Sequence, residues 1–235
     1  MKPRRLAASF GLIVMAQTMV QAWALPPAHA QTLPDAAVQD ESLKTYSVGI
    51  VKTRLLSRST GVGIYLGRGA VITAAHVVGR WHFLKDLQVR IAGQELPAKI
   101  VKEGSLEETD LTVLSVDEER LPVSLRLRRN PLCKDPMRIG REVVVVAGQA
   151  TARSRTISPQ LIPAQYRAKF GTVIADVALA TSGSGIFDAG RRCLLGIVSR
   201  RITRIDAKKI DQTEFAKYFV PASTMADFLP DEYRF

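Results

Sequence analysis

The stretch GVGIYLGRGAVITAAHVV, residues 61–78, carries the strongest fold signal of this chain. It holds two short apolar runs separated by the glycines of LGRG, a pattern typical of two β-strands in a hairpin. The second run leads directly into His76, so an imidazole follows a strand of the expected core. The stretch therefore predicts a hairpin that carries a candidate functional histidine.

Short apolar runs continue on both sides of this hairpin. They are separated by glycines, prolines and charged turns, with no long amphipathic helix between them. This spacing predicts an all-β sandwich or barrel and argues against a parallel α/β fold. The expected strands are 46–52, 63–66, 70–73, 87–91, 96–101, 111–116, 138–147, 170–176, 185–188 and 193–202, and the expected helical segments are 74–78 and 223–229.

The first 30 residues have the pattern of a secretory signal peptide. Three basic residues within the first five precede an uncharged segment, residues 6–25, which ends in prolines and small residues. An uncleaved membrane anchor is the alternative, because about 20 apolar residues can span a bilayer. We expect cleavage after Ala30 and a periplasmic or secreted mature protein whose residues 31–43 form a polar tail.

Composition excludes several classes of protein. Hydrophobic residues make up 46% of the 235 residues, which excludes a disordered, collagen-like or coiled-coil chain. Aromatic residues make up only 6%, so we expect no stacking surface for nucleic acid. The formal net charge is +11, and it stays basic without the signal peptide. No second segment is long and apolar enough to cross a membrane, so we expect no membrane contact after cleavage.

Three side chains are candidates for catalysis. Without the signal peptide only His76 and His82 remain, and we interpret His82, in the polar stretch RWHFLKD, as a structural or surface histidine. Asp110 directly precedes the apolar run LTVLSV, and a carboxylate beside a buried strand requires hydrogen-bond donors, such as a catalytic histidine. A cap at the end of the strand is the alternative role. Ser182 lies between small residues, which leaves room for a substrate, although a simple Ser/Gly turn has the same composition.

The order of these residues is His76, Asp110 and Ser182, which is the chymotrypsin order. No histidine follows Ser182, so the order of α/β-hydrolases is excluded. Here the chain resembles the trypsin-like serine peptidases of the chymotrypsin fold, in particular the bacterial secreted and periplasmic type. The resemblance rests on GVGIYLGRGAVITAAHVV, TDLTVL around Asp110, TSGSGIFD around Ser182, GIVS at 196–199 and FVPASTMADFL at 219–229.

The resemblance implies two antiparallel β-barrels, over residues 44–125 and 126–235, with a short C-terminal helix on the second. It implies Ser182 as the nucleophile, His76 as the general base and Asp110 as the group that orients it. It also implies an oxyanion hole formed by the backbone amides of Ala180 and Ser182. Relatives usually have glycine where this chain has Ala180, and a Cβ there would disfavour a positive φ.

Two functions follow from this resemblance. The first is a serine endopeptidase that hydrolyses protein or peptide substrates through an acyl-enzyme on Ser182. The second is a catalytically weak or inactive protein of the same fold that binds an acidic partner. Neither requires a cofactor, and no Cys or His pair has the spacing of a zinc site.

The candidate residues for substrate selection carry opposite charges. Asp176 lies six residues before Ser182, the offset at which trypsin keeps the carboxylate that selects Lys or Arg. Ser199, in the strand that forms a wall of that pocket in the family, is followed by Arg200 and Arg201, which favour an acidic residue. If Asp176 lies at the pocket floor, it favours cleavage after Lys or Arg, with an acidic or small residue as the alternative; a structural aspartate that closes the strand GTVIAD is the other interpretation of Asp176.

The two cysteines, Cys133 and Cys193, are expected to form a disulfide. Cys133 lies within the proline- and arginine-rich stretch at 123–136, which we interpret as the linker between the two halves, and Cys193 lies beyond it in the second half. An oxidising compartment and the absence of a third cysteine favour the pairing, and two separate buried thiols are the alternative.

Overall fold

The computed structural model describes residues 36–54, 57–79, 86–161, 164, 167, 173–205 and 212–234. All of them belong to one unit of the chain, Pro34–Phe235. The expected signal peptide, its cleavage after Ala30 and the interpretation of His82 lie outside these residues.

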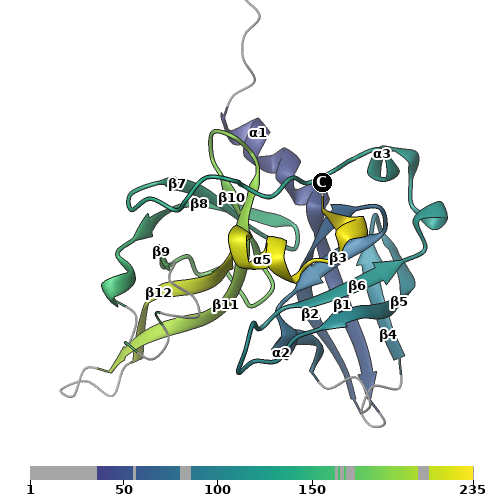
Figure 1. The fold of residues 1–235 in the computed structure, drawn as a ribbon, viewed down its shortest axis with the longest axis horizontal. Helices are drawn as coiled ribbons and strands as arrows, with labels where there is room; N and C mark the ends of the chain where they lie inside the picture. Colours follow the sequence, from purple (N-terminus) through teal and green to yellow (C-terminus); the bar gives the residue numbers. More distant parts are fainter. Residues whose placement is uncertain are drawn as a thin grey trace, which may run out of the picture. The chain divides into compact units, whose positions relative to one another are not determined.

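The described strands form two closed antiparallel barrels (Figure 1). The order in the first is β1-β2-β3-β6-β5-β4, and in the second it is β10-β11-β12-β9-β8-β7. The bounds are β1 Ser47–Arg54, β2 Ser57–Gly67, β3 Ala70–Thr73, β4 Asp86–Ile91, β5 Gln94–Glu103, β6 Thr112–Val116, β7 Glu142–Ala147, β8 Ala150–Ile157, β9 Val173–Ala175, β10 Gly185–Asp188, β11 Leu194–Ile205 and β12 Gln212–Pro221. The all-β prediction, with two barrels and a short C-terminal helix, is confirmed.

Helices are few and short in the described part of the chain. They are α1 Ala36–Ser42, α2 Ala75–Val78, α3 Val123–Arg126 and α5 Ala222–Phe228, with 3-10 turns at Leu43–Tyr46, Glu118–Arg120, Pro159–Leu161 and Asp231–Tyr233. The helix α5 is the expected C-terminal helix, and Leu229 behind it is buried. The helix α3 lies within the expected linker.

The hairpin β2–β3 is apolar on both faces because both faces are covered. Successive side chains of a strand point to opposite faces. Ile64 pairs with Ile72 and joins a core that also contains Phe187 of the second barrel. Tyr65 pairs with Val71 and faces the interior of the first barrel. The continuous apolar sequence of this hairpin therefore reflects a position between two cores.

The prediction of a polar tail at 31–43 is wrong for its second half, because residues 36–43 are folded. The helix α1 carries Asp40, whose side chain is buried and accepts hydrogen bonds from Arg153 Nε at 2.7 Å and Arg192 Nη1 at 2.6 Å. Leu43 follows in the shared core. The sequence shows no apolar period here, since the helix is held by charges on the second barrel rather than by an apolar stripe.

Two strands of the second barrel were not expected from the sequence. The strand β8 alternates polar and small residues, and β12 interrupts an apolar run with Lys217. Neither matches the simple pattern of a buried strand. The register in the structure shows why both form, since each closes the barrel against a strand on either side.

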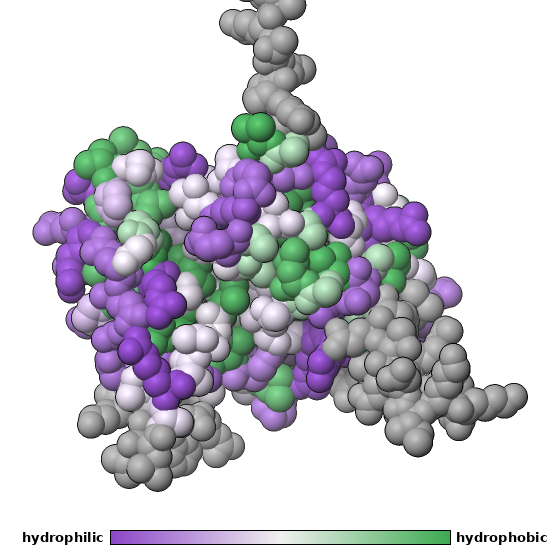
Figure 2. Space-filling view, turned by 180° about the vertical axis from the view of Figure 1, so that it is seen from behind, coloured by the Kyte–Doolittle hydropathy of each residue, from purple (hydrophilic) through white to green (hydrophobic). Residues whose placement is uncertain are grey.

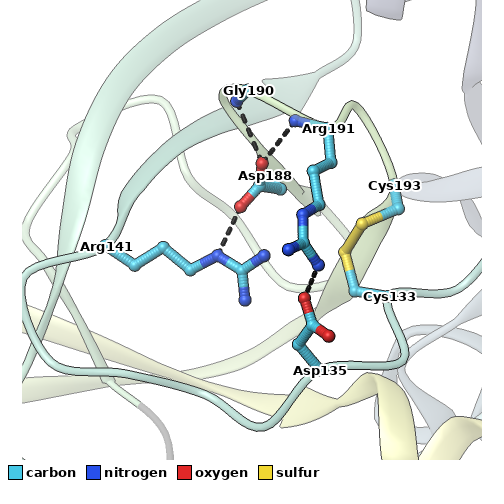
Figure 3. Close-up of a disulfide and its surroundings, with 7 residues drawn as sticks. All are labelled: Cys133, Asp135, Arg141, Asp188, Gly190, Arg191 and Cys193. Atoms are coloured by element: carbon cyan, nitrogen blue, oxygen red, sulfur yellow. Dashed lines mark hydrogen bonds and ion pairs between the residues drawn. A yellow bond between two sulfur atoms is a disulfide. The ribbon is translucent and has the colours of Figure 1, made fainter.

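Cys133 and Cys193 form the expected disulfide, with their Cα atoms 5.1 Å apart (Figure 3). It ties the linker to the turn after β10, where the Asp188 carboxylate accepts hydrogen bonds from the Gly190 and Arg191 amides and from Arg141. Burial raises the pKa of Asp188, but these hydrogen bonds outweigh it and leave the pKa below its ordinary value.

The visible face in Figure 2 is largely hydrophilic, with apolar areas interspersed. Among the described residues, the large apolar side chains that are most exposed are Leu127 and Ile139. No helix in the described ranges is both long and apolar enough to cross a membrane.

The Asp40 contact predicts a stability effect. Replacing Asp40 with Ala removes the carboxylate that pairs with Arg192 and Arg153, and it should lower the free energy of unfolding by about 2 kcal/mol. This is less than the roughly 3–5 kcal/mol for a fully buried pair, because both arginines are partly exposed. Urea unfolding of both variants measures this. Glu41→Ala on the same helix is the matched control, since Glu41 is exposed and its removal should change stability by less than about 0.5 kcal/mol. Equal midpoints for the two variants would contradict the role of Asp40.

Candidate active site

The Asp110 carboxylate is fully buried and lies at the centre of the site. It ends the tight turn 104–110, in which the amides of Glu108, Thr109 and Asp110 all bond to Ser105. Asp110 itself has a φ of 46°, a left-handed conformation that Asp tolerates better than most residues. This geometry turns its side chain inward, away from the solvent, before β6 begins.

His76 is held against Asp110 by two contacts. The helix α2 starts just after β3, and the His76 amide donates to Asp110 Oδ1 at 3.1 Å. The ring Nδ1 lies 2.9 Å from Oδ1 and 3.0 Å from Oδ2, so we infer that Nδ1 carries the proton. In the neutral ring Nε2 is then a proton acceptor. The Lys52 amine supports α2 by donating to the carbonyls of Val77 and Val78 at its last turn.

The second barrel reaches the same carboxylate through Ser199. Its hydroxyl donates to Asp110 Oδ2. The register of β11 against β12 shifts between Val198 and Arg200, so Ser199 is the extra residue of a β-bulge. A bulge re-aims side chains, which explains how a strand residue points towards the first barrel. Ser199 was expected near the substrate, and its contact with Asp110 was not foreseen.

Ser182 lies in the loop between β9 and β10, against the first barrel. The next residue, Gly183, has a φ of 88°, and a Cβ built there would lie 1.9 Å from the Val62 carbonyl oxygen of β2. Only glycine fits this contact between the barrels. The Ser182 hydroxyl donates to the Ser199 carbonyl at 2.9 Å. Among the described residues no hydrogen bond joins Ser182 to His76, although Ser199 bonds to both Ser182 and Asp110.

The Ala180 amide has a different partner from the one that an oxyanion hole requires. It donates to the Val177 carbonyl at 2.9 Å, within its own loop. Ala180 is not among the described residues with positive φ, so its Cβ is accommodated without strain. The amide is therefore engaged inside the loop instead of being available to a substrate oxygen.

The residues expected to select the substrate lie on β11 and at the end of β9. Arg200 is partly exposed and Arg201 exposed, and both belong to β11, while Asp176 directly follows β9. Lys217 of β12 was not predicted as a site residue; it is buried, and its amine lies 3.7 Å from Asp176 Oδ1. Its signal was a lysine inside the apolar run FAKYFVP.

A pocket of about 490 Å³ lies beside His76. It is lined by residues of α2 and of the turn before Asp110: Ala75, His76, Gly79, Glu103, Gly104, Ser105, Leu106, Glu107 and Glu108. Its three glutamates make it acidic. In the described ranges no group of three or more His, Cys, Asp or Glu side chains is arranged to hold a metal ion.

The first barrel carries a buried aspartate, Asp110, and His76, and the second barrel carries the loop with Ser182 beside them. This arrangement on two antiparallel barrels defines the chymotrypsin fold. A family model described as "Trypsin-like peptidase domain" matches residues 61–197. This range contains His76, Asp110 and Ser182 and covers more than half of the chain. The chain belongs to this trypsin-like peptidase family, and its fold is that of a protease.

Solved structures of bacterial proteases share the fold. The Rv3671c protease from M. tuberculosis, active form, is 17% identical with a TM-score of 0.54 over 92% of this chain and 93% of that chain. The serine endoprotease from Yersinia pestis is 20% identical with a TM-score of 0.58, over 83% and 65%. The MamO protease domain from Magnetospirillum magneticum is 17% identical with a TM-score of 0.55, over 80% and 98%. No curated protein matches this sequence.

The Ala180 loop predicts that a glycine increases activity. The Ala180 amide can leave the Val177 carbonyl only if the peptide between residues 179 and 180 turns. We expect this turn to move residue 180 towards positive φ. A positive φ costs a residue with a Cβ about 1–2 kcal/mol more than it costs glycine. Ala180→Gly should therefore raise kcat by about fivefold to thirtyfold with little change in KM. Steady-state kinetics on one peptide substrate measures this. Ala178→Gly, an exposed residue of the same loop, is the control for general loosening. A kcat that is unchanged by Ala180→Gly would show that residue 180 does not limit the oxyanion hole.

Proposed function

We propose that this protein is a serine endopeptidase that hydrolyses peptide bonds of proteins through an acyl-enzyme on Ser182. The observation that carries the proposal is the buried Asp110 carboxylate, which accepts hydrogen bonds from His76 of the first barrel and Ser199 of the second. A fully buried charge with these partners fixes the imidazole in one orientation and one tautomer, as a general base requires. The solved proteases of the same fold support protein or peptide substrates.

The reaction has two halves. Ser182 Oγ attacks the scissile carbonyl carbon while His76 Nε2 takes its proton, and Asp110 stabilises the resulting imidazolium. The tetrahedral intermediate then breaks its C–N bond, and the same proton goes to the leaving amine. Water next attacks the acyl-enzyme, gives a proton to His76, and the ester bond to Ser182 breaks as that proton returns to Oγ.

The resting site needs two local changes before this attack. The Ser182 hydroxyl must turn from the Ser199 carbonyl towards His76, which is a rotation about one side-chain bond. The Ala180 amide must exchange the Val177 carbonyl for the substrate oxygen. Both changes exchange one hydrogen bond for another, so binding of a substrate can drive them.

The alternative is a binding protein of the same fold with little or no turnover. The engaged Ala180 amide favours it, because an unformed oxyanion hole slows acylation by about a hundredfold or more. The buried Asp110 argues for the enzyme, since a scaffold kept only for binding has no use for a buried carboxylate that orients a histidine. We therefore propose the peptidase as the function.

A fluorophosphonate probe tests the nucleophile. Wild-type protein should be labelled, and Ser182→Ala should abolish labelling while its melting temperature stays close to that of the wild type. Ser184→Ala is the matched control, because Ser184 is fully buried and its hydroxyl accepts from the Thr181 amide instead of facing a substrate. It should lower stability by about 1 kcal/mol and retain labelling. Labelling that survives in Ser182→Ala and is lost in Ser184→Ala would assign the wrong serine.

We also propose that the mature enzyme is exported. Support comes from the signal-like pattern of the first 30 residues and from the disulfide, which persists in oxidising compartments. Mass spectrometry of protein from the periplasm or the medium should find an N-terminus at Gln31. A full-length chain retained in the membrane fraction would instead favour the uncleaved anchor.

A further inference from the structure

The pocket beside His76 is large enough for a complete side chain. Its volume of about 490 Å³ lies within the roughly 300–1,000 Å³ of typical ligand sites. One wall consists of residues of α2 with Gly79 behind them, and the other is the segment 103–108, which leads from the end of β5 towards Asp110. The pocket is therefore lined by the two segments that hold His76 and Asp110 in place.

Backbone contacts fix the wall that the segment 103–108 forms. Three successive amides, at 108–110, donate to the Ser105 carbonyl over distances of 2.7 to 3.2 Å. Gly104 packs so closely that a Cβ there would lie 2.6 Å from the Leu111 carbonyl oxygen and 3.3 Å from the Phe228 ring of α5. The shape of this wall therefore depends on the backbone rather than on flexible side chains.

The charge of the pocket lining is negative. Glu103, Glu107 and Glu108 line the pocket and are exposed, whereas no described lysine or arginine lines it. In the part of the chain that the structure describes, none of these three carboxylates forms an ion pair. The chain as a whole has a formal net charge of +11, so this pocket is an acidic site on a basic protein. A cleft lined by charges of one sign attracts ligands of the opposite sign.

The cation next to Glu103 in the sequence has another contact. Lys102 does not line the pocket, and its amine lies 4.7 Å from the centre of the Phe228 ring. Consecutive residues of a strand point to opposite faces, which separates the side chains of Lys102 and Glu103 on β5. Residues 80–85, which follow Gly79 and include one arginine and one lysine, lie outside the described residues.

The exposed part of His76 brings a substrate close to this pocket. The His76 side chain is 31% exposed, whereas the Asp110 side chain that Nδ1 contacts is fully buried. In the proposed reaction Nε2 exchanges a proton with Ser182 and with the leaving amine, so the scissile bond lies within hydrogen-bond reach of His76. His76 also lines the pocket. Residues close to the scissile bond are therefore within reach of the glutamates.

The lining fits a lysine or arginine side chain better than a metal ion. In the described ranges no three His, Cys, Asp or Glu side chains are arranged as metal ligands. Lysine and arginine combine an apolar stem with a cationic head. Ala75 and Leu106 offer apolar contacts to the stem, and the three glutamates offer acceptors to the head.

We propose that this acidic pocket is a substrate-binding subsite, which takes a lysine or arginine side chain from a residue within three positions of the scissile bond. The inference rests on the proposed peptidase function. It does not depend on Asp176, which does not line this pocket.

Matched peptides test the preference in the wild-type protein. Lys, Gln or Glu is placed in turn at each of three positions before the scissile bond and three after it, in an otherwise constant sequence. At one of these positions we expect kcat/KM for Lys to exceed that for Gln by about fivefold to twentyfold, and that for Glu to be lower than both. One exposed ion pair contributes up to about fivefold, and more than one carboxylate lines the pocket.

Salt provides a second readout of the same preference. The ratio of kcat/KM for Lys to that for Gln should fall at least twofold when about 0.5 M NaCl is added, because salt screens exposed charges. If Lys exceeds Gln at none of the positions, or if the ratio does not respond to salt, the proposal is wrong.

Variants then assign the preference to the pocket. The double variant Glu107→Gln/Glu108→Gln removes two charges and keeps the size of both side chains, so the ratio for Lys over Gln should fall by about threefold or more. The double variant Glu119→Gln/Glu142→Gln is the matched control, because it removes two exposed carboxylates that do not line the pocket. It should leave the ratio unchanged. A ratio that is the same in the pocket variant as in the wild type, or that falls equally in the control, would contradict the assignment.

Fluorophosphonate labelling separates this inference from the proposed function, because the small probe has no side chain to place in the pocket. Labelled protein that cleaves peptides without a preference for Lys at any position would refute the subsite and leave the peptidase intact. Protein that neither labels nor cleaves any peptide would refute the peptidase and the subsite together. If the double pocket variant does not fold, Glu107→Gln alone should still lower the ratio, by about twofold, and an unchanged ratio would again refute the subsite.

Discussion

The burial of one carboxylate, that of Asp110, constrains the rest of the site. An ionised group without water requires hydrogen-bond donors, and its donors come from both barrels: the His76 amide and ring on the first, and the Ser199 hydroxyl on the second. Neither barrel alone satisfies this carboxylate. The two barrels are therefore joined at the point where the chemistry is expected, and the same hydrogen bonds that stabilise the interface also orient the histidine.

The loop that carries Ser182 meets the first barrel through a residue without a side chain. Gly183 packs directly on the Val62 carbonyl, so the position of the serine is set by backbone contact and does not depend on a flexible side chain. The neighbouring Ala180 amide is bound to Val177 in the same loop. The loop is thus held in place, but the Ala180 amide is not free; in the proposed peptidase, the free energy of turning this one peptide would therefore control the rate.

Charged side chains, as well as apolar ones, determine how the second barrel is built. Asp40 binds Arg153 and Arg192, Asp188 binds Arg141, and Lys217 binds Asp176. Each of these pairs has at least one buried member, and each joins segments that are distant in the sequence. Asp40 and Asp188 are the buried members of their pairs, whereas in the third pair the buried member is Lys217.

The sequence alone determined the all-β class, the hairpin that carries His76, most strands, the C-terminal helix and the cysteine pair, because these features follow from local apolar runs, glycine turns and the count of cysteines. It also suggested the His, Asp and Ser candidates from their order. Four contacts are visible only in the tertiary structure. Asp40 anchors a helix, Ser199 donates to Asp110, the Ala180 amide donates to Val177, and Lys217 forms an ion pair with Asp176. In each of these contacts, the partner of a residue depends on the direction of the backbone or on the register of the strands. Neither the direction nor the register can be read from the residue types along the chain.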